Sequence, residues 1–278
     1  MQWESGRRSD NVIDRRGMRG PIVGGGIGMA VLALVVYMLG GDPRAVMEIA
    51  QSGEPTEDGA APRGAPADEG GAFVSAVLAD TEDTWDSVFR ERFGKDYDEP
   101  ELVLFSDAVR SQCGVAGASV GPFYCPLDQR VYIDLAFYRD LKERFSAPGD
   151  FAQAYVIAHE VGHHVQQLLG TGDQVRAQQE RGGRAAANAL SVRTELQADC
   201  YAGMWAHHAQ RVRQIVEPGD IEEALNAAAA IGDDRLQRKE QGHVVPESFT
   251  HGSSQQRMTW FRRGFESGKL EACDTFGS

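Results

Sequence analysis

The sequence predicts a predominantly helical α+β protein, with a small antiparallel sheet ahead of a central helix and one N-terminal transmembrane helix. Three observations support this prediction. Apolar residues recur at helical spacing over residues 151–169 and 188–208. Short runs rich in β-branched and aromatic residues stand before the first of these helices. Residues 22–39 carry no charge and are apolar or glycine.

The apolar run from Ile22 to Leu39 is just long enough to cross a bilayer. Its 18 residues would extend about 27 Å as a helix, against a hydrocarbon core of about 30 Å. Five arginines precede the run and Asp42 follows it, which predicts a cytoplasmic basic segment over residues 1–20 and a single-pass anchor over residues 21–40. A cleaved signal peptide is the alternative, but an Ala-x-Ala cleavage site is not evident after the run.

The remainder of the chain is predicted to lie on the extracytoplasmic side of the cytoplasmic (inner) membrane, in the periplasm or outside the cell. Residues 41–72 are acidic and rich in Pro, Gly and Ala, which predicts a disordered linker. Residues 73–278 are then the folded domain. The formal net charge of −13 understates the acidity of this domain, because the five arginines lie before the anchor. Nucleic acid is therefore not an expected partner.

The folded domain is expected to begin with an amphipathic helix near Phe73. Three strands follow, over residues 101–105, 119–124 and 130–135, and the last two form a hairpin. After the two helices named above, further helices are predicted over residues 218–232 and 254–265, with a loop over residues 241–252.

The central helix carries the motif His-Glu-Val-Gly-His over residues 159–163. Histidines four residues apart lie on one helical face, so His159 and His163 can bind one metal ion. Glu160 between them can act on water as a general base without being a ligand. The motif predicts a zinc hydrolase.

A catalytic zinc site needs a third protein ligand and an open position. The metzincin pattern is excluded, because Gln166 and Leu169 stand where it requires Gly and His. Glu195 is the preferred third ligand, since the second helix places it on one face with Asp199. Similar pairs occur in gluzincin-type sites, where the aspartate accepts the N–H of a ligating histidine. The alternatives are a solvated acidic pair, or ligation by Asp173, His207 or His208.

Several segments carry a family resemblance. They read H-E-V-G-H-H-V-Q-Q, E-L-Q-A-D-C-Y-A-G-M-W-A, G-P-F-Y-C-P followed by V-Y-I-D-L, V-V-P-E-S-F-T-H-G-S-S-Q-Q-R, and the opening M-Q-W-E-S-G-R-R-S-D-N-V-I-D-R-R-G. Nearly the whole chain resembles the bacterial family named "putative neutral zinc metallopeptidase". The resemblance implies a membrane-associated, gluzincin-type zinc peptidase with a zincin-like domain. In zincins an edge strand before the motif helix pairs with an extended substrate.

The predicted function is hydrolysis of a peptide or protein substrate with Zn²⁺ as cofactor. His159, His163 and Glu195 bind the ion, while Glu160 takes a proton from water and delivers it to the leaving amine. His251 is the candidate donor to the oxyanion, and a surface histidine is the alternative interpretation. Lower-ranked donors are Tyr201, Tyr124 and Tyr155. Two other functions remain open: a zinc amidase for a non-peptide envelope substrate, and a non-catalytic envelope scaffold with a structural zinc site.

Four cysteines fit an exported domain, because disulfides form in oxidising compartments. Four cysteines allow three pairings. Cys113 and Cys125 are close in sequence and flank a predicted turn, so we favour this pair together with Cys200–Cys273. A cysteine zinc site is disfavoured, since the sequence contains no C-x-x-C pair.

Overall fold

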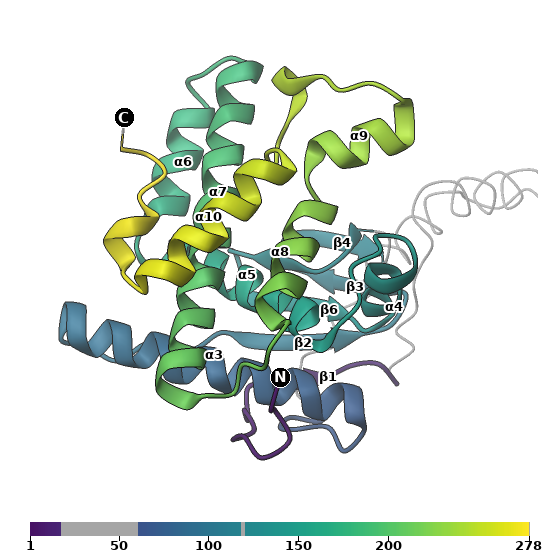
Figure 1. The fold of residues 1–278 in the computed structure, drawn as a ribbon, viewed down its shortest axis with the longest axis vertical. Coiled ribbons are helices and arrows are strands. Elements are labelled where there is room, and N and C mark those ends of the chain that lie inside the picture. The colour runs from purple at the N-terminus through teal and green to yellow at the C-terminus, as the bar shows by residue number, and fades with distance from the viewer. Residues whose placement is uncertain (18–60, 118–119, 278) are drawn as a thin grey trace, which may run out of the picture.

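The fold is predominantly helical with two small sheets, which confirms the predicted α+β class (Figure 1). The computed structural model describes residues 1–17, 61–117 and 120–277. Its strands are β1 (Val12–Asp14), β2 (Glu101–Phe105), β3 (Ala108–Ser111), β4 (Gly114–Gly117), β5 (Phe123–Cys125) and β6 (Arg130–Asp134). Its α-helices are α3 (Glu69–Phe93), α4 (Ala136–Glu143), α5 (Asp150–Leu168), α6 (Thr171–Gln179), α7 (Arg184–His208), α8 (Asp220–Ala230), α9 (Asp233–Gln241) and α10 (Ser254–Ser267).

The larger sheet is mixed, with strand order β1-β2-β6-β5. β1 pairs in parallel with β2, and β2 pairs in parallel with β6. β5 and β6 form the antiparallel pair of this sheet. The prediction of an antiparallel sheet is therefore wrong for the β1–β2 and β2–β6 pairings, whereas the predicted hairpin of β5 and β6 is confirmed. Parallel neighbours need a long crossover connection, and α3 lies on the connection from β1 to β2. The hairpin of β3 and β4 was not predicted, because both strands are short and β4 consists mostly of Gly and Ala.

Each face of the larger sheet packs against a different partner. One face contributes to the main core with the helices, through Val12, Leu102, Leu104, Val131 and Ile133. The other face forms a smaller core with the β3–β4 hairpin, through Ile13, Val103, Phe105, Tyr132 and Val109. Alternate residues of a strand point to opposite faces of the sheet. Because both faces are covered, apolar residues occupy both faces of the central strands.

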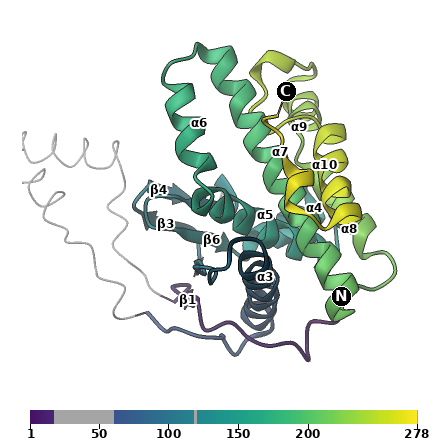
Figure 2. The same ribbon diagram turned by 90° about the vertical axis from the view of Figure 1, so that its left-hand side faces the viewer.

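The helices form layers over the first face of the sheet. Helix α5 contacts β5 and β6 on one side and α7 on the other, and α10 packs along α7 (Figure 2). The motif helix α5 is thus enclosed between the sheet and α7. This burial explains why its apolar residues extend around most of its surface.

The N-terminal residues belong to the folded body. Val12 and Ile13 of β1 are 0% and 1% exposed, and Val12 is in register with Leu102 of β2. Glu82, buried on α3, accepts hydrogen bonds from Arg7 at 2.7 Å and from Asn11 at 3.0 Å. Residues 1–17 are therefore not the separate basic segment that the sequence predicts over residues 1–20.

The start of the main body also precedes the predicted boundary at residue 73. Arg63 forms an isolated bridge with Ile13, and Asp68 caps α3 by accepting the Gly71 N–H at 3.0 Å. Arg16 forms ion pairs with both Asp14 and Asp68, which joins the N-terminal residues to this cap. The linker predicted over residues 41–72 thus includes ordered residues at its end.

The transmembrane anchor predicted over residues 21–40 lies outside the described residues. Within residues 1–17, 61–117 and 120–277, no helix combines the length and the apolar character that a membrane crossing requires.

Candidate metal centre

The motif helix α5 brings two imidazole rings side by side. The ring centroids of His159 and His163 are 4.8 Å apart and their planes are nearly perpendicular, at 87°. His159 and Glu160 are buried, and His163 is partly exposed. Burial raises the pKa of Glu160, although the nearby histidines lower it. The motif therefore combines two nitrogen donors with a carboxyl group that holds a proton more readily than in water.

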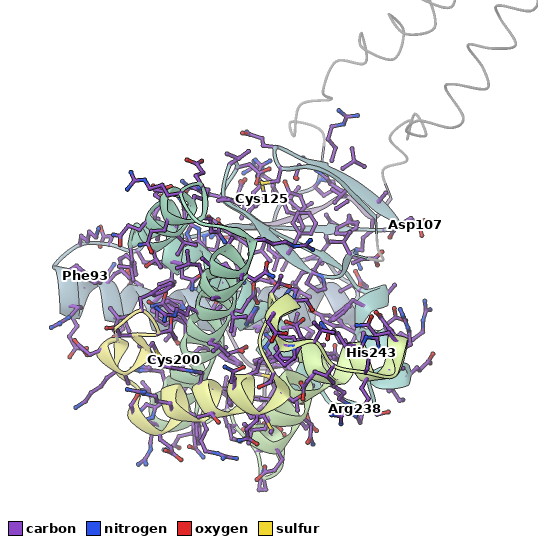
Figure 3. The ribbon with its side chains drawn as sticks, turned by 90° about the horizontal axis from the view of Figure 1, so that it is seen from above. Phe93, Asp107, Cys125, Cys200, Arg238 and His243 are labelled. Carbon is purple, nitrogen blue, oxygen red and sulfur yellow. A yellow bond between two sulfur atoms is a disulfide. The ribbon has the colours of Figure 1, made fainter. Side chains whose placement is uncertain are left out.

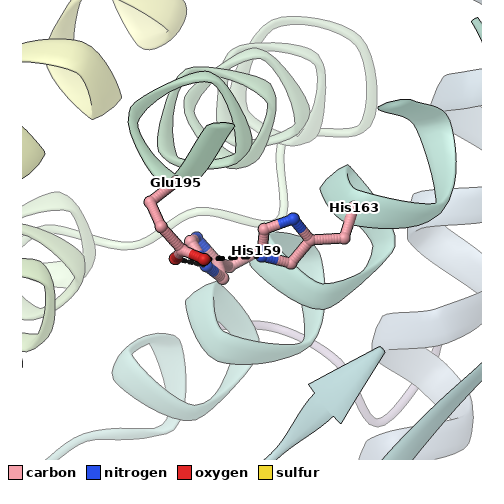
Figure 4. A group of neighbouring side chains, drawn as sticks. All are labelled: His159, His163 and Glu195. Carbon is pink, nitrogen blue, oxygen red and sulfur yellow. Dashed lines mark hydrogen bonds and ion pairs between the residues drawn. The ribbon is translucent and has the colours of Figure 1, made fainter. Parts of the chain in front are cut away.

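Glu195 approaches the two histidines from α7, as Figure 4 shows. Its Oε2 lies 3.1 Å from Nε2 of His159, and its Oε1 lies 3.5 Å from Nε2 of His163. The helices can approach closely here because Gly162 faces Ala198, whose carbonyl oxygen would lie only 3.1 Å from a Cβ at residue 162. One candidate ligand atom from each of the three side chains lies within 4.8 Å of the others.

Asp199 holds the far side of the His159 ring. Its Oδ1 lies 2.9 Å from Nδ1 of His159 and also accepts the Tyr155 hydroxyl. Burial lowers the pKa of His159, but Asp199 and Glu195 outweigh it and raise the pKa to about 10. The Nδ1–H bond fixes the ring orientation, so Nε2 is the atom that faces Glu195.

Gln166 holds the His163 ring in the same way. Its Oε1 accepts the Nδ1–H of His163 at 2.9 Å, and its Nε2 donates to the Thr194 carbonyl at 2.7 Å. Gln166 also donates to Gln197 at 3.1 Å. No role was predicted for Gln166 beyond its exclusion of the metzincin pattern. Both histidines therefore have an acceptor on Nδ1 and present Nε2 to the same point.

Arg257 was not predicted to belong to the site, yet it lies beside Asp199. It comes from α10, and its Nε lies 2.8 Å from Oδ2 of Asp199. A signal was present in the sequence, since Arg257 falls at helical spacing with Phe261 and Gly264, the other buried residues of this helix.

His251 lies on a loop that packs next to Glu195. A Cβ at Gly252 would lie 3.4 Å from Leu196, the neighbour of Glu195. Asp233 organises this loop: its Oδ2 accepts the backbone N–H groups of Thr250, His251 and Gly252 at 2.7–3.0 Å. The hydrogen bond that the His251 ring donates to Asp233 raises the pKa of this imidazole, against burial, and the charge of Glu195 adds to the effect.

The structure separates the other candidate ligands from this cluster. Asp173 is exposed and paired with Arg176 on α6. His207 contacts the Phe265 carbonyl at 2.6 Å, and His208 lies near the Gly268 carbonyl at 3.4 Å. His164, next to the motif, contacts the Asp98 carbonyl and the Tyr124 hydroxyl.

Both predicted disulfides are confirmed. Cys113 pairs with Cys125 and Cys200 pairs with Cys273. Figure 3 shows that Cys125 lies among the strands, whereas Cys200 lies beside the C-terminal helix. The second bond fixes the chain end against α7, in the turn that follows Glu195.

Two imidazoles and a carboxylate held on adjacent helices define a candidate site for a catalytic zinc ion, since these are ligands that zinc accepts in hydrolases. The chain belongs to the family named "putative neutral zinc metallopeptidase", which matches residues 1–276. The name of the family implies zinc as the metal.

Relatives extend over most or all of the chain. "Uncharacterized protein YpfJ" of Escherichia coli (strain K12) is 50% identical over 100% of this chain and 99% of its own length. "Uncharacterized protein Rv2575" of Mycobacterium tuberculosis (strain H37Rv) is 45% identical over 74% of this chain and 72% of its own length. No solved structure matches the chain.

Proposed function

We propose that the protein is a gluzincin-type zinc metallopeptidase that hydrolyses peptide bonds. His159, His163 and Glu195 would hold the zinc ion. The observation that carries the proposal is the convergence of both Nε2 atoms and the Glu195 carboxylate, while each Nδ1 is already bonded to an acceptor. Bound zinc would polarise the scissile carbonyl and make water more acidic.

Glu160 supplies the proton transfer in this proposal. It is buried next to the two histidines, and its raised pKa suits a group that must both accept and release a proton. Glu160 takes a proton from the attacking water and then gives it to the leaving amine. General acid–base groups of this kind contribute about 10²–10⁴-fold to the rate.

His251 is the proposed donor to the oxyanion of the substrate. Asp233 raises its pKa, so the ring holds its second proton to higher pH than a free imidazole does, which favours donation to an oxyanion. The hydroxyls of Tyr124 and Tyr155 are already bonded to His164 and Asp199, which disfavours them as donors.

An extended peptide is the proposed substrate. β5 is an edge strand of the larger sheet and contacts α5, so a peptide strand added there would lie next to the motif helix. Among the described residues, this cluster gathers three candidate ligands, whereas a structural zinc site uses four. This difference favours a peptidase over a zinc scaffold.

We also propose that the body is extracytoplasmic and membrane-attached through residues 21–40. Its two disulfides support an oxidising compartment, and the apolar run supports attachment.

The test compares wild type, Glu160→Gln and Glu195→Gln, with exposed Glu180→Gln as the matched control. Zinc content and casein cleavage are measured with and without a chelator. Glu160→Gln should lower cleavage by about 10²–10⁴-fold with zinc retained. Glu195→Gln should lose zinc, and the control should match wild type. Full activity in Glu160→Gln, after exclusion of contaminating proteases, would contradict the proposal.

A further inference from the structure

Arg257 is an arginine buried in the interior, with a side chain only 2% exposed. Its guanidinium binds Asp199 with two parallel hydrogen bonds, from Nε to Oδ2 at 2.8 Å and from Nη2 to Oδ1 at 2.9 Å. Two-point binding fixes the plane of a carboxylate as well as its position. Arg257 therefore determines how Asp199 faces its other partners.

Those partners lie on the motif helix. Oδ1 of Asp199, which receives the Nη2 bond, also accepts Nδ1–H of His159 at 2.9 Å and the hydroxyl of Tyr155. Arg257 itself reaches the Tyr155 hydroxyl at 3.2 Å. Arg257, Asp199 and His159 come from α10, α7 and α5, so one chain of contacts crosses all three helices.

Stability alone is a weak reason for such a pair. The cost of removing two charges from water often exceeds their mutual attraction in an interior, and an apolar pair can be as stable. A close approach of the helices is also needed: a Cβ at Gly264 of α10 would lie only 1.9 Å from the Cys200 carbonyl oxygen of α7. The packing brings Arg257 to the carboxylate of Asp199, which contacts the candidate ligand His159.

We propose that Arg257 is a positioning residue that orients His159 through Asp199. The inference rests on the proposed zinc site. Loss of the guanidinium leaves Asp199 free to turn, so the His159 ring loses its fixed direction and Nε2 binds metal less tightly. Changes in partners of ligating histidines typically reduce metal affinity by about 10–100-fold.

The experiment measures cobalt(II) affinity and the visible absorption of the bound cobalt, which reports ligand geometry. Arg257→Met should weaken binding by about 10–100-fold and alter the absorption bands. Arg257→Lys keeps the charge but loses the two-point geometry, so its affinity should be intermediate. Arg262→Met, at an exposed position of the same helix, should match wild type.

A double-mutant cycle separates positioning from general destabilisation. In an Asp199→Ala background no side-chain oxygen at position 199 joins Arg257 to His159, so adding Arg257→Met should cause no further loss of cobalt affinity. The double variant also avoids an uncompensated buried charge if Arg257→Met alone does not fold. Unchanged affinity and bands in Arg257→Lys, or additive losses in the cycle, would overturn the inference. Failure of wild type to bind cobalt, or binding unaffected by His159→Ala, would instead overturn the proposed zinc site.

A second inference concerns the membrane and rests on β1. Strand pairing cannot cross a bilayer, and Val12–Asp14 pair directly with residues 102–104 of β2. Glu82 of α3 and the α3 cap residue Asp68 bind arginines of the same N-terminal segment. We infer that residues 1–17 and 61–277 lie on one side of any membrane, whatever the course of the residues between them.

This inference disagrees with both expectations for residues 21–40, the single-pass anchor and the cleaved signal peptide. A single crossing would separate β1 from β2, and signal cleavage after the apolar run would remove β1 from the sheet. The test uses the full chain in cells with Glu4→Cys or Glu240→Cys, both at exposed positions, and a membrane-impermeant maleimide. Equal labelling in intact cells is expected for the two positions, whichever compartment holds them. Labelling of one position alone, or a mature chain without residues 1–17 by mass spectrometry, would overturn the inference.

Discussion

The side-chain oxygen of Gln166 accepts the Nδ1–H of His163 at 2.9 Å, one helical turn further along α5. The amide cannot reverse without loss, because its nitrogen donates to Thr194 and Gln197. The amide of Gln166 therefore bonds Nδ1 of His163 as the carboxylate of Asp199 bonds Nδ1 of His159. The two candidate ligands are held by groups of different charge.

Replacing Gln166 should therefore weaken zinc binding without removing a ligand. We expect Gln166→Leu to raise the dissociation constant of zinc by about 10–100-fold, because the His163 ring is free to rotate. The measurement is competition with a chelator of known affinity. Gln167→Leu, at the adjacent and partly exposed position, is the control. Equal affinities for the two variants would show that Gln166 does not orient His163.

Zinc binding should release a proton from His159. The pKa of this imidazole is about 10 in the metal-free protein, because Asp199 and Glu195 outweigh the effect of burial. A ligating imidazole must be neutral, so zinc has to displace that proton below this pKa. Affinity should then rise about tenfold per pH unit towards pH 10 from this group alone.

Calorimetry in buffers of different ionisation enthalpy measures the proton count. About one proton per zinc is expected from His159 at pH 7.5, where an imidazole of ordinary pKa near 6.5 would release about a tenth of one. Asp199→Asn should lower the count, since it removes the carboxylate that raises the pKa most. An unchanged count in that variant would contradict the assignment of the proton to His159.

Loss of His251 should slow turnover but leave zinc in place. Removing an oxyanion donor typically costs about 10²–10³-fold in kcat, so we expect His251→Ala to lose that much with unchanged zinc affinity. His243→Ala, at an exposed position in the same long loop, is the control. Reduced zinc content in His251→Ala would place the residue among the metal ligands instead.

The pH profile should depend on Asp233. Asp233 raises the pKa of His251, so the protonated ring persists to higher pH in wild type. Asp233→Asn keeps a hydrogen-bond acceptor for the loop but removes the charge, and the pKa of His251 should fall. The alkaline limb of kcat against pH should therefore move to lower pH. An unmoved limb would show that another group sets it.

Local spacing made much of the candidate site predictable. His159 and His163 are one turn apart on α5, and Glu195 and Asp199 are one turn apart on α7. The helical period alone places the members of each pair on one face of their helix. Because the sequence offers few other candidate ligands, the two pairs were predicted to lie together. Helical spacing does not report contacts between different helices, so no role was predicted for Gln166 or Arg257.

Nonlocal pairing explains the main errors in the fold. β1 is only three residues long and is flanked by charged residues. The local sequence therefore resembles a basic terminal segment. Its pairing with β2 depends on residues far along the chain, and short windows of sequence do not report such contacts. The parallel pairing of the central strands was missed for the same reason.

The two disulfides should differ in their effects on stability and on the metal centre. Cys200–Cys273 spans a sequence separation of 73 and Cys113–Cys125 one of 12. Loop-closure entropy then predicts losses of about 4 and about 3 kcal/mol in the free energy of unfolding when the paired alanine variants are made. Denaturant titration of the metal-free variants measures both losses.

Cys200–Cys273 is linked to the candidate ligand His163 through two glutamines. The Cys273 carbonyl accepts the amide of Gln197 at 3.0 Å, and Gln197 in turn holds Gln166. Removing Cys200–Cys273 should therefore also weaken zinc binding, whereas removing Cys113–Cys125 should leave the affinity unchanged. The variant without Cys113–Cys125 is the matched control, because it also lacks one disulfide. Equal zinc affinities in the two folded variants would show that the C-terminal chain does not support the centre.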